Sequence, residues 1–158
     1  MAWLQWVEQS SIATAIRGSV WLYPSIEILH ITGFVALAGA AAMFDLRLLG
    51  VSRQLAVDQI SRFLLPVSRL SVLVVGPSGL ALFVSDATAL SVNPAFRVKL
   101  ILLVCAALNA YALHRWCFPG VMAWRMDRPA PLGARVAAST SLLLWTGVIS
   151  CGRLIAYL

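Results

Sequence analysis

Four long apolar stretches run through this sequence and decide which solvent it can fold in. They cover roughly residues 22–44, 63–84, 98–118 and 137–157. A helix needs about 20 apolar residues to cross the hydrocarbon core of a bilayer. The sequence therefore predicts an all-α fold, an integral membrane bundle of four transmembrane helices.

The charge content supports this prediction. Only 11% of the residues are charged, whereas soluble domains carry about a quarter. Neither an internal repeat nor a linker to a second domain stands out, so residues 1–158 are predicted to form a single transmembrane domain.

Residues 1–18 are predicted to form an amphipathic helix at the membrane interface. Trp3 and Trp6 alternate with polar residues such as Gln5 and Glu8, a pattern typical of helices that lie at the level of the lipid headgroups. The segment lacks the basic start and continuous apolar core of a signal peptide.

Arginines account for nearly all of the positive charge, and most of them flank the apolar stretches. This position is typical of topology signals rather than of a nucleic-acid surface. The connections on one side of the predicted bundle hold Arg47, Arg53, Arg62, Arg115, Arg125, Arg128 and Arg135. The other side holds Arg17, Arg97, Lys99 and Arg153. The positive-inside rule puts the larger group in the cytoplasm and predicts that both termini face outward.

Ionisable groups within the spans are the first place to look for function, because each costs about 2.5–3.5 kcal/mol at the helix centre. The predicted outer half contains Glu27, His30, Lys99, Arg153 and Tyr157. One interpretation is an ion-pair network, in which Glu27 pairs with Lys99 or Arg153 and holds the bundle in register. The other is an outward-facing site for an anionic or quinone-like ligand, or for a proton-coupled step.

A second polar cluster is predicted in the inner half of the bundle. It consists of Asp45, Arg69, Asn109 and His114. Arg69 either extends to the headgroups or pairs with Asp45, and His114 is interpreted as an interfacial residue.

Metal and haem sites are weaker alternatives. His30, Cys105 and Cys151 fall at similar predicted depth, and thiolates with imidazole suit copper or zinc, but they form no compact motif. His30 and His114 differ in predicted depth by roughly 12 Å, which argues against one haem held by both. A haem with one ligand, or one shared between subunits, stays open.

Three segments carry a resemblance to a known family. They are residues 21–50, which include Tyr23, Glu27 and His30, residues 93–116, and residues 141–158, which include the Gly152-Arg153 pair. The chain resembles small bacterial inner-membrane proteins catalogued as a domain of unknown function, and is loosely similar to the membrane domains of copper-resistance proteins. The resemblance implies a four-helix, multi-pass architecture in the bacterial inner membrane, where the outward-facing termini would lie in the periplasm, and it assigns no activity.

Three classes of function stay open. The first is a small binding or transport module with its ligand in the outer half, and the second is a redox subunit with haem or quinone. The third is a structural subunit of a larger membrane complex. No hydrolase, metalloprotease or phosphate-loop motif occurs, so a non-enzymatic role is favoured. Alanines and Gly39 in the first span favour close helix packing, and with it a homo-oligomer or association with other membrane subunits.

Overall fold

The computed structural model describes residues 2–52, 54–117 and 130–158. Its long helices are α3 (Leu22–Leu49), α4 (Val57–Ser85), α6 (Pro94–Ala112) and α7 (Leu132–Leu154). A π-helical turn, η1 (Leu113–Cys117), continues α6. Four helices are long and apolar enough to cross a membrane, which confirms the predicted fold class. α4 begins before its predicted span, and α7 both begins and ends before its own.

The apolar side chains of these helices face outward. In the most apolar window of α3, α4 and α6, only 11% of the residues are buried inside the protein, and the value for α7 is 17%. An apolar surface of this extent needs an apolar solvent. The chain is therefore a multi-pass membrane protein whose surroundings are a lipid bilayer.

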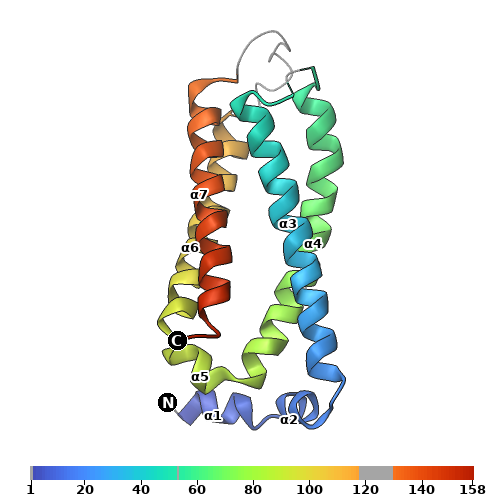
Figure 1. The fold of residues 1–158 in the computed structure, drawn as a ribbon, viewed down its shortest axis with the longest axis vertical. Coiled ribbons are helices and arrows are strands. Elements are labelled where there is room, and N and C mark those ends of the chain that lie inside the picture. The colour runs from blue at the N-terminus through green and yellow to red at the C-terminus, as the bar shows by residue number, and fades with distance from the viewer. Residues whose placement is uncertain (1, 53, 118–129) are drawn as a thin grey trace.

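The two ends of the bundle differ (Figure 1). Both termini lie at one end, which we call the terminal end, together with the short helices α1 (Ala2–Glu8), α2 (Ser11–Gly18) and α5 (Ala87–Val92). α3 and η1 end, and α4 and α7 begin, at the opposite end, which we call the arginine end. Of the arginines that predicted the orientation, Arg53, Arg125 and Arg128 lie outside the described residues.

The amphipathic N-terminus forms two helices where the sequence predicted one. α1 and α2 lie across the terminal end (Figure 1), with a break after Gln9. The Ser10 hydroxyl accepts a hydrogen bond from the Ala13 amide at 3.3 Å and caps α2. A serine cap of this kind starts a new helix, so the single helix predicted for residues 1–18 is divided in two.

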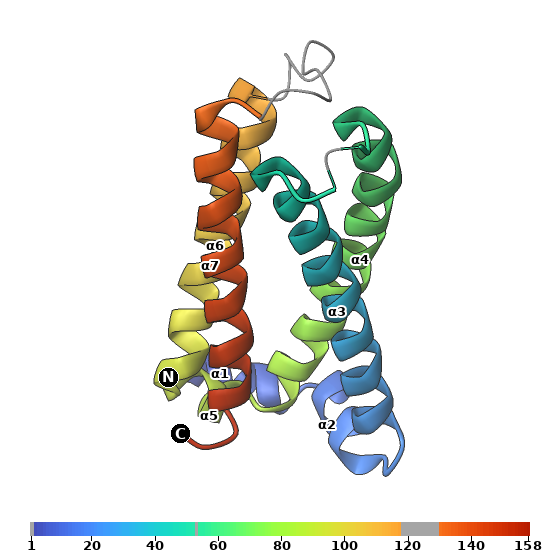
Figure 2. The ribbon, with the colours of Figure 1, turned by 45° about the horizontal axis from the view of Figure 1, so that its top comes forward.

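The long helices pack less closely on one side of the bundle than on the others. α3 packs against α4, α6 packs against α7, and the two pairs meet where α3 contacts α7. Figure 2 shows α3 and α7 neighbouring each other, with α4 and α6 on the same side behind them. α4 and α6 meet through the stacked rings of Phe83 and Phe96, whose centroids lie 5.6 Å apart at the terminal end. Within the described residues, however, no Cα atoms of the two helices lie within 8 Å of each other. The bundle is thus closed on the α3–α7 side and less tightly closed on the α4–α6 side.

Local sequence signals set several helix ends. The Asn93 side chain accepts from the Phe96 amide at 3.1 Å, and Pro94 occupies the first turn of α6, where its missing N–H costs nothing. Gly50 ends α3 at φ 109°, a left-handed conformation that glycine adopts without strain. Pro66 and Pro77 both lie inside α4, where each removes one helical hydrogen bond, and α4 changes direction along its length (Figure 1).

Small side chains build the core at the arginine end. Phe44 and Leu48 of α3 pack with Leu64 of α4. The other buried members of this cluster are Ala40, Val57, Leu113, Ala130, Ala134 and Ala138. Four of these nine residues are alanines, which let helix backbones approach closely where the surrounding lipid supplies no hydrophobic driving force.

A polar clasp fastens the N-terminal helices to the terminal end. The Glu8 carboxylate accepts hydrogen bonds from the Thr88 hydroxyl and, at 3.2 Å, from the Thr88 amide. Arg17 donates to the carbonyl oxygens of Ser85 and Glu8, both at 2.6 Å. The hydrogen bonds from Thr88 hold the pKa of Glu8 below its ordinary value of 4.5, because they favour the charged carboxylate.

The clasp should weaken in acid. Since the folded-state pKa of Glu8 is lowered, its contribution to stability is complete above pH 4.5 and is lost as the pH falls through the folded-state pKa. We expect the Thr88 amide to lose protection from hydrogen exchange over this range. Glu8→Gln should lower the protection at neutral pH and remove its pH dependence, whereas Glu27→Gln should change neither. Equal protection in the wild type and Glu8→Gln would contradict the role of the clasp.

Candidate functional site

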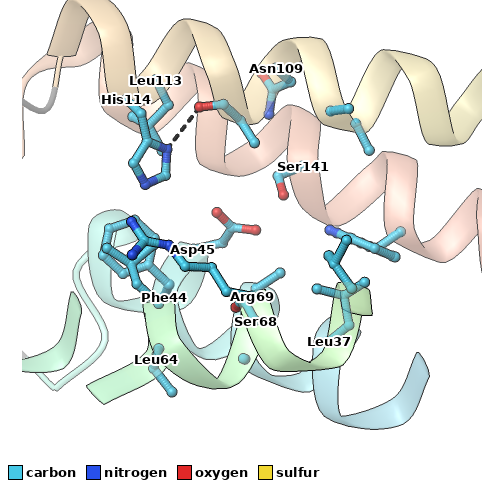
Figure 3. Close-up of a pocket in the computed structure, with 18 of the residues that line it drawn as sticks. Leu37, Phe44, Asp45, Leu64, Ser68, Arg69, Asn109, Leu113, His114 and Ser141 are labelled. Atoms are coloured by element: carbon cyan, nitrogen blue, oxygen red, sulfur yellow. Dashed lines mark hydrogen bonds between the residues drawn. The ribbon is translucent and has the colours of Figure 1, made fainter. Parts of the chain in front are cut away.

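A cavity of about 700 Å³ lies between the four long helices, in the half of the bundle nearer the arginine end. Figure 3 shows its polar side chains converging from different helices. Asp45 comes from α3, Arg69 from α4, and Asn109 from α6. The remaining lining is almost entirely apolar and comprises residues such as Leu37, Leu73, Ala106, Leu113 and Trp145. Ligand sites in proteins are of similar volume, about 300–1,000 Å³, and of similar composition.

The cavity lies where the bundle is least tightly closed. α4 and α6 both line it, and within the described residues no Cα atoms of the two helices lie within 8 Å of each other. Gly76 contributes no side chain, and a Cβ atom built there would meet nothing within 4 Å. The residue after it, Pro77, cannot bond to the carbonyl of Leu73, and Leu73 also lines the cavity. The Gly76-Pro77 pair thus helps to keep this part of α4 away from α6.

Asp45 is the most deeply buried charged group of the cavity. Its side chain is 3% exposed, and its Oδ2 atom has no hydrogen-bond partner among the described residues. Ser141 of α7 lies beside the carboxylate and interacts with it (Figure 3). A buried acceptor without a partner costs about 1–3 kcal/mol, and more when it is charged. Such a cost points to a functional role for this oxygen.

Arg69 and His114 lie across the cavity from each other (Figure 3). The π-helical turn η1 places His114 at the cavity edge, and its Nδ1 atom lies 2.8 Å from the Ala110 carbonyl oxygen. Because that oxygen only accepts, Nδ1 is the donor. Within the described residues no ion pair of 4.0 Å or less joins Arg69 to Asp45, the pairing that the sequence left open. Arg69 adds a permanent positive charge to the same cavity.

The α6–α7 wall is held by a hydrogen bond in the membrane interior. The Asn109 side-chain amide donates to the Ala137 carbonyl at 2.9 Å. Trp145 of α7 lines the cavity and meets Phe34 edge-on, with ring centroids 5.8 Å apart. The first contact fixes α6 against α7, and the second fixes α3 against α7.

The structure brings together all four residues of the predicted inner cluster. Asp45, Arg69, Asn109 and His114 line the same cavity. Sequence reasoning missed Ser68, Gly76, Ser141 and Trp145, which also line it. The Gly76-Pro77 pair was the available signal, because a proline in a span marks a place where packing departs from a regular helix.

The residues of the predicted outer cluster lie outside this cavity. His30 packs against α4, where its Nδ1 lies 3.0 Å from the Ser78 hydroxyl. A Cβ atom at Gly79 would stand 2.8 Å from the Cε1 atom of His30. The imidazole therefore fills the space left by that glycine and joins α3 to α4. His114, by contrast, lines the cavity that His30 does not reach.

The cations of the outer cluster have aromatic neighbours. The Lys99 ammonium lies 6.0 Å from the centre of the Phe34 ring and acts electrostatically on His30. Arg153 donates to the Tyr157 hydroxyl at 2.5 Å. Glu27 is exposed, and within the described residues no ion pair of 4.0 Å or less joins it to Lys99 or Arg153. The structure therefore links these residues pairwise rather than as one network.

The two cysteines considered for a metal site lie in different environments. Cys105 is exposed on α6, and Cys151 is buried on α7. In the described part of the chain, no group of three or more histidine, cysteine, aspartate or glutamate side chains is arranged to hold a metal ion.

The close approach of His30 to Gly79 makes a quantitative prediction. Gly79→Ala should destabilise the α3–α4 pair by about 1–3 kcal/mol, because the added methyl group displaces the imidazole. The free energy of unfolding, measured by denaturant titration in mixed micelles, should show this loss. In a His30→Ala background the same substitution should cost almost nothing. Gly39→Ala is the control, since a Cβ atom there meets nothing within 4 Å.

Comparison with known proteins does not add to this geometry. No protein-family model, curated protein or solved structure matches the chain. The family suggested by the resemblance of three segments stays a prediction, and the role of the cavity is argued from its own residues.

Proposed function

We propose that this chain is a membrane-embedded binding module that takes up a lipid-soluble molecule from the bilayer. The cavity between α4 and α6 carries the proposal. It lies within the spans, is apolar along most of its lining, and presents Asp45, Arg69 and His114 at its polar end. A ligand with an apolar body and a polar ring or headgroup matches this division.

The entry route follows from the packing. The stacked rings of Phe83 and Phe96 join α4 to α6 at the terminal end and do not line the cavity. Because no Cα atoms of the two helices lie within 8 Å of each other in the described residues, a molecule dissolved in the lipid reaches the cavity by passing between them. Gly76, which has open space beside it, lies on that route. A ligand that enters sideways need not cross the headgroups, so the cavity suits a hydrophobic molecule better than a water-soluble one.

The inner cavity is favoured over the outer cluster for a structural reason. The outer residues are engaged by neighbours of their own, as His30 is by Ser78 and Arg153 by Tyr157. The ligand site predicted around Glu27, His30 and Lys99 stays a prediction, as do the roles of redox subunit or structural subunit, a homo-oligomer, and association with other membrane subunits.

Filling the cavity should abolish binding. We expect a short-chain alkyl benzoquinone, a lipid-soluble quencher of tryptophan fluorescence, to quench Trp145 in a saturable manner in reconstituted wild-type protein. Gly76→Leu should weaken this binding at least about tenfold, because the leucine side chain occupies the route between α4 and α6.

Gly39→Leu is the matched control. Gly39 is also exposed in a span, also has nothing within 4 Å of its Cβ position, and does not line the cavity. The Gly39→Leu variant should leave the quenching unchanged, whereas Trp145→Phe should remove most of the saturable signal. Quenching of the same affinity in Gly76→Leu and Gly39→Leu would overturn the proposal.

We also propose that the arginine end faces the cytoplasm of a bacterial inner membrane. The described residues Arg47, Arg62, Arg115 and Arg135 lie toward that end, and positive residues are retained on the cytoplasmic side. A C-terminal fusion to alkaline phosphatase should then be active, and a C-terminal fusion to green fluorescent protein should stay dark. The reverse pattern would invert the orientation.

A further inference from the structure

We propose that the ligand of the cavity carries a hydroxyl group that donates a hydrogen bond to Asp45, as a neutral hydroquinone or alkylphenol does. This inference rests on the proposed function and specifies the chemistry of the ligand's polar end. It concerns binding alone and involves no chemical step.

The first argument is the state of the carboxylate. Asp45 is 97% buried, and its Oδ2 atom has no hydrogen-bond partner within the described part of the chain. Buried acceptors are nearly always satisfied. Since the cavity adjoins Asp45, a ligand in the cavity is in position to supply the missing donor.

The second argument is the neighbourhood of this oxygen. Ser141 interacts with the carboxylate, the Asn109 amide is used by the Ala137 carbonyl, and Arg69 makes no ion pair of 4.0 Å or less with Asp45 in the residues described. The protein groups that face Asp45 therefore leave one acceptor position unfilled. A ligand that offers only acceptors, such as a quinone or an ether, does not satisfy it.

The third argument concerns charge. A phosphate-bearing headgroup would bring a full charge into a cavity whose lining is mostly apolar, and burial of a charge there is costly. A neutral ring with a hydroxyl avoids this cost. Its second polar substituent can accept from Arg69, which lines the same cavity. The aromatic side chains of Phe44 and Trp145 are also part of the lining, and they suit a planar ring.

The test compares three probes of matched shape that differ in hydrogen bonding. They are a short-chain alkyl hydroquinone, the corresponding alkyl benzoquinone, and the dimethyl ether of the hydroquinone. Each is incubated without oxygen with wild-type protein in lipid nanodiscs, and the retained probe is extracted and quantified against empty nanodiscs. We expect the hydroquinone to bind about tenfold more tightly than the other two, since a hydrogen bond to a buried oxygen that otherwise lacks a partner is worth about that factor.

Substitutions then assign the preference to one residue. Asp45→Asn keeps the shape of the side chain and replaces one carboxylate oxygen by a donor, so the preference for hydroquinone should fall below about twofold. Asp58→Asn is the matched control, because Asp58 does not line the cavity, and it should keep the full preference. The wild-type comparison is decisive even if Asp45→Asn does not fold.

The outcomes separate the two proposals. Equal affinities of the three probes in the wild type, or a full preference in Asp45→Asn, would overturn the hydroxyl assignment. If the three probes bound equally well to the wild type and Gly76→Leu abolished the binding of all three, the cavity would stand as the ligand site. Retention of no probe above that of empty nanodiscs would overturn both.

Discussion

The bilayer interior offers no water to polar groups, and this constraint organises every polar side chain in the spans. Several hydroxyl groups bond to a carbonyl of their own helix. Ser78 donates to the Val74 carbonyl at 2.6 Å, and Ser85 donates to that of Ala81 at 2.8 Å. Such bonds satisfy a hydroxyl locally and at little cost. Asp45 departs from this rule, because its Oδ2 atom is buried without a partner, and the departure coincides with the cavity.

Properties that depend on the nearest residues in the chain could be predicted from the sequence. The spans follow from local hydropathy, and the start of α6 follows from Asn93 and Pro94. The depth of Asp45 and His114 follows from counting along their helices, so the inner cluster could be assembled by depth alone. Each of these predictions uses a segment and its solvent, without reference to a second helix.

Properties that depend on how the helices are rotated and spaced could not be predicted. The cavity lies where the backbones of α4 and α6 are widely spaced, and apart from the Gly76-Pro77 pair no pattern within either helix indicates that spacing. The same holds for the outer cluster. Opposite charges favoured ion pairs of Glu27, yet Lys99 lies over the Phe34 ring and Arg153 bonds to Tyr157. Within a span, an aromatic face or a neighbouring hydroxyl satisfies a cation without burying a second charge.

The two halves of the bundle use glycine in opposite ways. Toward the terminal end, the space beside Gly79 is filled by the His30 ring, so the missing side chain tightens the α3–α4 pair. Three residues earlier on α4, the space beside Gly76 is empty and adjoins the cavity. A single helix thus passes from close packing to an open wall within one turn, at the point where Pro77 interrupts its hydrogen bonding. The packing of His30 at Gly79 and the buried cluster of Phe44, Leu48 and Leu64 toward the arginine end hold α4 against α3 on either side of this open wall.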